Sequence, residues 1–183
     1  MPASFRLAAG DRVSLVGPSG SGKTLLLRSL ADLDPHDGTM ILDGTTSEAT
    51  PAPLWRRRVG LLPADSAWWD ERVGGNLPPG SADWLAPLGL AADIIDWPVS
   101  RLSSGERQRL ALARLLTLGP DVLLLDEPTA HLDADNQHRV ENLLLDHVKT
   151  HAIAWLWVSH DPTQATRIGN RHWRMAGGRL IVE

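Results

Sequence analysis

Cysteine is absent from the 183 residues, which excludes disulfide bonds and thiolate chemistry. Tyrosine is absent as well and phenylalanine occurs once, whereas tryptophan occurs eight times. No apolar run approaches the roughly 18 residues that a membrane-spanning helix needs, and the N-terminus lacks the apolar stretch of a signal peptide. We therefore expect a soluble, cytoplasmic protein, whose membrane role would have to come through a partner.

Positive charge is also scarce. The 18 Lys and Arg residues face 22 Asp and Glu residues, and the net charge of -4 argues against a dedicated nucleic-acid-binding protein. The one cationic cluster, Arg56–Arg58, is interpreted as a solvated loop. Only Lys23 and Lys149 are lysines, so in a chain that otherwise uses arginine, Lys23 indicates a need for a compact point charge.

Short β-branched or leucine-rich runs alternate with helical patterns, which predicts an α/β fold with a mainly parallel sheet. We expect strands at 12–16, 39–44, 58–62, 121–126 and 153–159, helices at 23–33, 104–118, 134–149 and 162–168, and a hairpin at 171–183. Prolines break the middle of the chain into short helices and loops. The expected organisation is a single domain, 1–183, whose core is formed by about 1–64 and 119–183, with a small helical subdomain inserted at about 65–118.

The segment "GPSGSGKT" matches the phosphate-binding pattern G-x-x-x-x-G-K-[ST] and lies between a predicted strand and a predicted helix. Its glycines let backbone N–H groups approach phosphate oxygens, and the helix N-terminus adds partial positive charge. We expect Lys23 to reach the β- and γ-phosphates and the Thr24 hydroxyl to ligate Mg²⁺. A chance Gly/Ser turn is the alternative. The candidate nucleotide-binding residues are Gly17, Pro18, Ser19, Gly20, Ser21, Gly22, Lys23 and Thr24.

Two adjacent acids end the apolar run in "DVLLLDEPTAHLD". Asp126 stands at the carboxyl end of a predicted buried strand, where it can hold Mg²⁺ through water. Glu127 is suited to orient or deprotonate an attacking water. In isolation, such a pair is equally compatible with solvated turn residues, but following a phosphate-binding loop it favours a nucleotide site.

The stretch "LSSGERQRLALARLL" contains a capping box, Ser103 with Glu106, that opens an amphipathic helix. Together with the two motifs above and with the histidine of "WVSHD", His160, it resembles the signature motif of ABC-type ATPases, and the motifs follow that family's order. The resemblance covers nearly the whole chain. It implies a RecA-like P-loop NTPase core with a mainly parallel sheet, a reduced N-terminal antiparallel β part and a small inserted helical subdomain.

In that family, two ATPase domains pair head to tail and sandwich ATP between the phosphate loop of one and the signature of the other. The resemblance therefore implies a homodimer on ATP binding, with Glu127 as catalytic base and His160 contacting the γ-phosphate. On chemistry alone, His160 could equally be a polar loop residue. The loop 130–133, "AHLD", would cross to the partner. The residues that would contact the nucleotide of the opposite subunit are Ser103, Ser104, Gly105 and Glu106.

The sequence departs from the family pattern in three places. Ala64 stands where the family has a glutamine that ligates Mg²⁺ and senses the γ-phosphate, and Asp65 could substitute for it imperfectly. Ser104 replaces a typical glycine of the signature. Ahead of Phe5 no residue can supply the aromatic platform on which adenine usually stacks, so we expect adenine binding to be weak or to use other contacts.

The motifs imply the ATP-binding and hydrolysing subunit of a membrane ABC transporter, with ATP and Mg²⁺ as cofactors and a transmembrane permease as partner. The subunit would lie at the cytoplasmic face of the membrane, and no nucleic-acid partner is expected. Within the family, the compact middle and the tail resemble the FetA-like group of iron or metal exporters. Two alternatives stay open: a soluble ABC ATPase, and a nucleotide-binding scaffold impaired by the missing glutamine.

Trp68 and Trp69 follow the position of the missing glutamine. Neighbouring side chains in an extended segment point to opposite sides, so we expect one ring to pack into the subdomain and the other to join a docking surface for the permease near Ala64–Arg72. The alternative is that both rings belong to the core.

Overall fold

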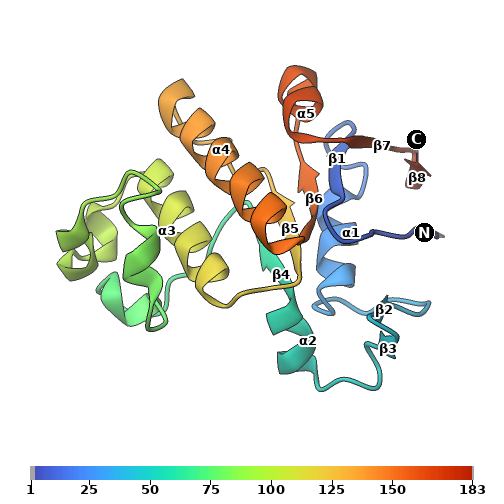
Figure 1. Ribbon diagram of the computed structural model, residues 1–183, viewed down its shortest axis with the longest axis horizontal. Coiled ribbons are helices and arrows are strands. Elements are labelled where there is room, and N and C mark those ends of the chain that lie inside the picture. Colours follow the sequence, from blue (N-terminus) through green and yellow to red (C-terminus); the bar gives the residue numbers. More distant parts are fainter. Residues whose placement is uncertain (1–2, 183) are drawn as a thin grey trace.

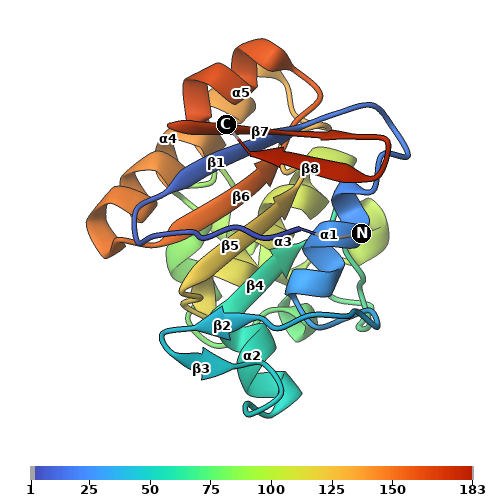
Figure 2. The ribbon, with the colours of Figure 1, turned by 90° about the vertical axis from the view of Figure 1, so that its right-hand side faces the viewer.

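The computed structural model describes residues 3–182 and contains one six-stranded sheet in the order β4-β5-β6-β1-β7-β8 (Figures 1 and 2). Every neighbouring pair is parallel except β7 and β8, which form the predicted C-terminal hairpin. The strands are β1 (Arg12–Val16), β4 (Val59–Leu62), β5 (Val122–Asp126), β6 (Ala154–Val158), β7 (Arg171–Ala176) and β8 (Arg179–Val182). The predicted mainly parallel α/β sheet is confirmed.

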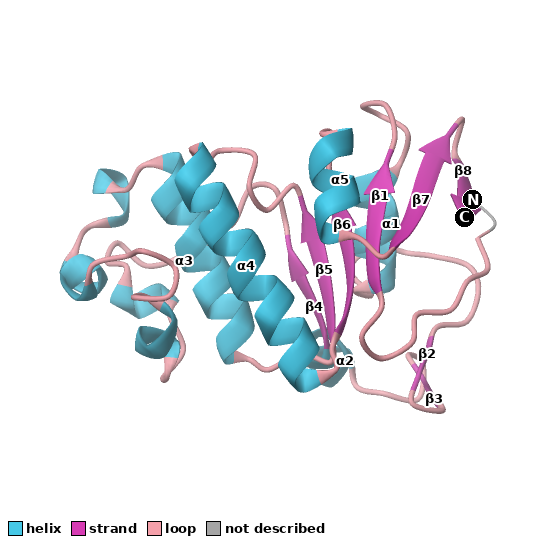
Figure 3. Ribbon diagram, turned by 45° about the horizontal axis from the view of Figure 1, so that its top comes forward, coloured by secondary structure: helices cyan, strands magenta, loops and turns pink. Residues whose placement is uncertain are grey.

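Helices cover both faces of this sheet (Figure 3). They are α1 (Lys23–Leu30), α2 (Ala52–Arg58), α3 (Ser104–Thr117), α4 (Ala134–His151) and α5 (Pro162–Ile168). No helix within residues 3–182 is both long and apolar enough to cross a membrane.

The side-chain alternation of the strands separates the two faces. In β5, Leu123 and Leu125 belong to one apolar cluster with α3 and α4, whereas Leu124 belongs to a second cluster with α1 and α2. In β6, Trp155 and Trp157 face the first cluster and their neighbours face the second. Because successive side chains of a strand point to opposite faces, α1 and α3 must cover opposite faces of the sheet.

The middle of the chain is built from short turns of 3-10 helix followed by α3. These are η1 (Gly74–Asn76), η2 (Ser81–Trp84), η3 (Ala92–Asp96) and η4 (Val99–Arg101). Their buried side chains, such as Leu88 and Ile94, join the same cluster as α3 and β5. The predicted short helices are therefore present, while the division into a core and an inserted subdomain at 65–118 stays a prediction.

The interpretation of Arg56–Arg58 as a solvated loop is wrong, because these residues form the last turn of α2. Pro51 and Pro53 fix the first turn of this helix, where a missing N–H is tolerated, and the arginines lie at its negative end. Trp55 anchors it: the ring is buried and its indole N–H donates to the carbonyl of Leu30 at 3.0 Å.

Two further boundaries differ from expectation. The helix predicted at 23–33 ends at Leu30, and Asp32 adopts a left-handed conformation with φ of 54° that stops it. The strand predicted at 39–44 is reduced to β2 (Ile41–Leu42), which pairs with β3 (Thr45–Thr46) in a separate antiparallel hairpin rather than in the main sheet.

Candidate functional site

The topology gathers the predicted nucleotide motifs at one edge of the sheet. Strands β1, β4, β5 and β6 are parallel, so their carboxyl ends share that edge (Figure 2). The residues that follow these ends are the phosphate loop after β1, Ala64 after β4, Glu127 after β5 and His160 after β6. Crevices at the carboxyl ends of parallel strands are the usual ligand sites of such sheets.

The phosphate loop is held close to the neighbouring strand. A Cβ added to Gly17 would meet the carbonyl oxygen of Met175 far inside contact distance, so only glycine fits there. Lys23 is buried, and its ammonium donates to the carbonyl oxygens of Gly17 and Pro18 at 2.8 and 3.0 Å. These two hydrogen bonds hold the charged end of Lys23 inside the phosphate loop.

The remaining residues of the loop are placed for an anion. Pro18, Ser19 and Gly20 are exposed, and Gly22 precedes α1 with φ of 102°. The hydroxyl of Ser21 is buried with no hydrogen-bond partner in the described structure. A buried hydroxyl without a partner is costly, and a phosphate oxygen would satisfy it.

Thr24, in the first turn of α1, and Asp126, the last residue of β5, are in direct contact. The Thr24 hydroxyl donates to Asp126 Oδ2 at 2.7 Å. Burial raises the pKa of Asp126 and the nearby Glu127 charge raises it further, against the lowering effect of the Thr24 hydrogen bond. A buried carboxylate beside a hydroxyl is a donor set that Mg²⁺ accepts, completing its shell with phosphate oxygens and water. Among the residues described, no group of three or more His, Asp or Glu side chains is placed to hold a metal.

Glu127 and His160 form a close pair, since His160 Nε2 lies 2.8 Å from Glu127 Oε1. Both side chains are partly exposed at the nucleotide edge. Glu127 has φ of 50°, a left-handed conformation that is uncommon for a residue with a Cβ. The structure thus brings together the two residues expected to be catalytic.

The predicted capping box at the start of α3 is confirmed. The Ser103 hydroxyl accepts from the Glu106 backbone N–H at 3.2 Å, and the Glu106 carboxylate accepts from the Ser103 backbone N–H at 2.9 Å. The backbone hydrogen bond from Ser103 lowers the pKa of Glu106. Ser103 and Ser104 are exposed, which leaves this helix N-terminus open to a ligand.

Gly105, in contrast, packs against the chain itself. A Cβ at this position would lie 3.1 Å from the carbonyl oxygen of His131 and 3.2 Å from Leu132. The loop 130–133 therefore runs tightly along the start of α3. The exposed Ser104 and the exposed His131 flank this contact.

A hollow of about 220 Å³ lies beside Ala64, between the loop after β4 and the start of α3. Its walls include Asp65, Trp68, Ser104 and His131. Ala64, which stands where ABC-type ATPases have a glutamine, therefore borders open space rather than packed core.

The two tryptophans separate as predicted. Trp68 is partly buried and packs against the core cluster, whereas Trp69 is 68% exposed. Arg114 of α3 contacts both rings, with its guanidinium carbon 5.4 Å from the Trp68 centroid and 4.7 Å from the Trp69 centroid. The idea that both rings belong to the core is therefore wrong.

Phe5 is also engaged. Its ring packs on Trp173 of β7 with centroids 4.7 Å apart, so it is occupied within the fold.

Sequence reasoning missed the role of Arg109, which the pattern treats as an ordinary polar residue near the start of α3. Its buried guanidinium donates to the carbonyls of Leu88 and Gly89 and to the side chain of Asn136. It thereby connects α3 to the segment between η2 and η3 and to α4. The acceptors lie far from Arg109 along the chain, so a local sequence pattern does not reveal these contacts.

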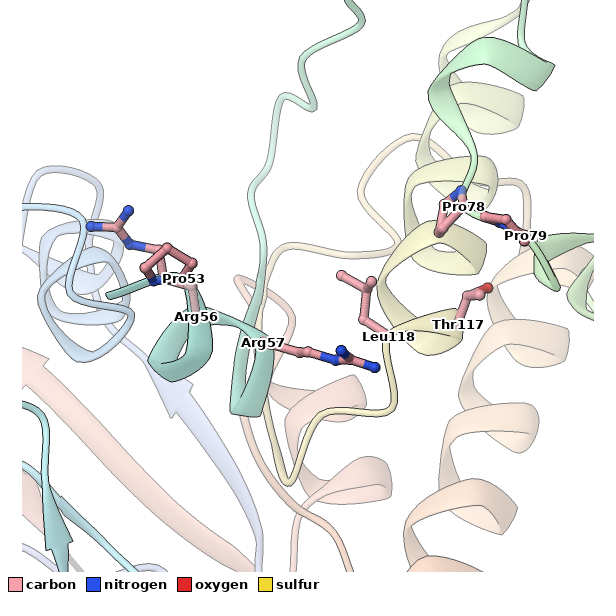
Figure 4. A pocket seen from close by; sticks show the side chains of 7 residues that line it. All are labelled: Pro53, Arg56, Arg57, Pro78, Pro79, Thr117 and Leu118. Carbon is pink, nitrogen blue, oxygen red and sulfur yellow. The ribbon is translucent and has the colours of Figure 1, made fainter. Parts of the chain in front are cut away.

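A larger hollow of about 460 Å³ lies away from this site, between α2, the end of α3 and the Pro78–Pro79 segment (Figure 4). Arg57 points toward Leu118 across it (Figure 4). The neighbouring chain segments enter β4 and β5 at their amino ends, so this hollow lies at the opposite edge of the sheet from the phosphate loop.

Comparison with known proteins gives the same family as the motifs. Residues 1–130 match the family model described as "ABC transporter". The chain is 40% identical over 181 residues to an aliphatic sulfonates import ATP-binding protein, SsuB 2, of Pseudomonas savastanoi, and spans 95% of itself and 64% of that relative. It is 34% identical over 171 residues to the probable iron export ATP-binding protein FetA of Escherichia coli, covering 86% of this chain and 76% of the relative.

Solved structures agree on the fold. A dimeric ATP-binding cassette in a post-hydrolysis state, bound to ADP and Pi, superposes with a TM-score of 0.84 at 23% identity, over 97% of this chain and 88% of that chain. The RecA-like P-loop fold expected from the motifs is thereby confirmed. From the family match, the relatives and the order of the motifs along one sheet edge, the chain belongs to the ABC transporter family of ATP-binding proteins.

Proposed function

We propose that this protein binds and hydrolyses ATP as the energising subunit of a membrane ABC transporter. One observation carries the proposal: the phosphate loop, the Thr24–Asp126 pair and the Glu127–His160 pair converge at the carboxyl edge of four parallel strands. The chain spans about two thirds of the sulfonate-import relative, and the shared part contains all of these motifs. Purified protein should release phosphate from ATP only when Mg²⁺ is present. Unchanged release in the presence of a chelator would contradict the proposal.

Each side chain then has a role that its position supports. The ammonium of Lys23 would exchange its carbonyl partners for the β- and γ-phosphates, and the hydroxyl of Ser21 would donate a hydrogen bond to a phosphate oxygen. Thr24 and Asp126 would hold Mg²⁺, which neutralises phosphate charge when bound. Glu127 would accept a proton from the attacking water on its carboxylate, and His160 would donate to the γ-phosphate.

This assignment requires the 2.8 Å Glu127–His160 pair to open. In the closed pair, a carboxylate oxygen of Glu127 is occupied by the imidazole. Nucleotide binding supplies a competing acceptor for His160, which releases the carboxylate for water. The pair therefore keeps the base occupied until the substrate is present.

The signature supports a two-subunit sandwich. The phosphate-loop helix α1 and the signature helix α3 cover opposite faces of the sheet (Figure 1). One chain therefore presents two anion-binding helix N-termini on different sides, and a second, head-to-tail copy would bring Ser103, Ser104 and Gly105 over the nucleotide. Light scattering should show dimers with ATP and monomers without it.

The permease partner would dock near Ala64–Arg72. Trp69 is mostly exposed there, and the guanidinium of Arg114 packs over its ring in a cation–π contact. A relative named as a sulfonate importer is 40% identical to this chain and one named as a probable iron exporter is 34% identical, so the resemblance to the FetA-like exporters stays a prediction. We place the subunit at the cytoplasmic face of the membrane through this contact.

Substituting each tryptophan should separate its role. Trp68→Ala removes a ring that packs against the core and should lower stability by about 2–4 kcal/mol, as large core truncations do. Trp69→Ala removes an exposed ring and should leave stability within about 0.5 kcal/mol, while reducing capture by permease-containing membranes. Urea unfolding and membrane co-sedimentation measure the two effects. The docking assignment would fail if Trp69→Ala bound membranes as well as the unaltered protein does.

The alternative of an impaired scaffold rests on Ala64. The hollow beside this residue leaves room for a longer side chain, so Ala64→Gln should fold normally. We expect roughly a tenfold rise in ATP turnover, the size of one charge-assisted hydrogen bond to phosphate or metal. Ala67→Gln, on the same exposed loop, is the matched control and should not change the rate. An unchanged rate in Ala64→Gln would instead assign the role to Asp65 or to water.

A further inference from the structure

A buried polar network links the loops that carry Glu127 and His160, and its residues have no role in the ATP hydrolysis proposed above. Its centre is Gln164 of α5, which is 5% exposed. Its amide oxygen accepts from the Ser159 hydroxyl at 2.7 Å. Its amide nitrogen donates to the Thr129 hydroxyl at 2.7 Å and to the Glu141 carboxylate at 2.8 Å. Every polar atom of this amide is therefore engaged.

The partners of Gln164 belong to the two loops that carry the candidate catalytic residues. Ser159 immediately precedes His160, and Thr129 follows Glu127 by two residues. The loops leave neighbouring parallel strands, where Asp126 pairs with Val158. A single side chain thus connects them through two short hydrogen bonds.

Glu141 determines the orientation of the Gln164 amide. It is 1% exposed on α4, and Arg167 donates to it twice, at 2.7 and 2.8 Å. Burial raises the pKa of Glu141, but hydrogen bonds from Arg167, Gln164 and Gln137 outweigh it and lower the pKa below its usual value. A carboxylate only accepts, so the amide of Gln164 must point its nitrogen toward Glu141 and its oxygen toward Ser159.

We propose that Gln164 is a positioning residue for ATP hydrolysis: its amide, oriented by Glu141, sets the Glu127 loop relative to the His160 loop. The inference rests on the proposed ATPase function. Glu127 adopts its left-handed conformation only if the surrounding structure holds it there, and the Thr129 link lies close by in the chain. Small displacements of catalytic groups reduce the chemical step more than ground-state binding.

The main test compares Gln164→Met with the unaltered protein. Methionine keeps the length of the side chain and loses both links. We expect kcat for ATP to fall roughly 10- to 100-fold, the effect of a misplacement of about 1 Å, with KM within about twofold. Ile168→Val, which trims a fully buried residue of the same helix outside the network, is the control for lost stability alone. It should lower Tm and leave kcat unchanged. Wild-type kcat in a folded Gln164→Met would overturn the proposal.

A second set of variants keeps the test informative if Gln164→Met folds poorly. Thr129→Val and Ser159→Ala each remove one hydroxyl and cut one link, and each should lower kcat severalfold at unchanged KM. In the Gln164→Met background, Thr129→Val should have no further effect on kcat, because the link is already broken. Full additivity of the two substitutions would overturn the proposal, since merely structural contributions add. An unaltered protein that binds but never hydrolyses ATP would instead overturn the proposed function, and the inference with it.

Discussion

Glu127→Gln should reduce ATP turnover at least roughly 100-fold while ATP binding is retained, because the amide keeps the shape of the carboxylate and loses its basicity. Glu127 follows Asp126 at the carboxyl end of β5, and among the described residues it is the acid that lies within ion-pair distance of His160, at 2.8 Å. Its left-handed conformation, with φ of 50°, aims it out of the strand. Phosphate release measures the loss, and a fluorescent nucleotide measures the binding.

The control for this variant is Glu48→Gln, the same chemical change at an exposed position after β3. It should hydrolyse ATP at the rate of the unaltered protein. Because Glu127→Gln binds without turning over, it should also accumulate as an ATP-bound dimer that elutes earlier in size-exclusion chromatography. A turnover rate in Glu127→Gln equal to that of the unaltered protein would remove the residue from the reaction.

Local sequence motifs were sufficient to select the candidate site residues. Lys23, Thr24, Asp126 and Glu127 could be selected as candidates because each belongs to a local motif with a fixed spacing, located at or after the end of a predicted strand. The capping box of α3 is equally local. The meeting of Thr24 with Asp126, 102 residues apart in the chain, followed only from the expectation that parallel strands share an edge.

Other features depend on contacts that no local pattern reports. Gln164 and Glu141 lie on different helices and become a connected pair only when α4 and α5 pack together. The three arginines of α2 were interpreted as a solvated loop, whereas Pro51 and Pro53 stand at the one end of a helix that tolerates proline. The fates of the two tryptophans were predicted in kind, one ring inside and one outside, but only the packing shows which is which.

Lys23→Ala should weaken Mg-ATP binding roughly 10- to 100-fold, since one charge-assisted hydrogen bond is worth about 1.5–3 kcal/mol. Unlike most buried substitutions, it should not destabilise the nucleotide-free protein. The buried ammonium is held by two carbonyl oxygens, of Gly17 and Pro18, rather than by a carboxylate, and removing a buried charge relieves its desolvation cost.

The two effects of Lys23→Ala can be separated by thermal unfolding with and without Mg-ATP. Without nucleotide, the Tm of Lys23→Ala should equal or exceed that of the unaltered protein. With nucleotide, the rise in Tm that binding produces should shrink, because stabilisation by a ligand falls as its Kd increases. Lys149→Ala is the matched control: it replaces the only other lysine, exposed in the last turn of α4, and should keep the full rise. If Lys23→Ala kept that rise as well, the phosphates would have to be held by the loop backbone and the α1 N-terminus alone. The buried lysine would then destabilise the fold without strengthening ATP binding.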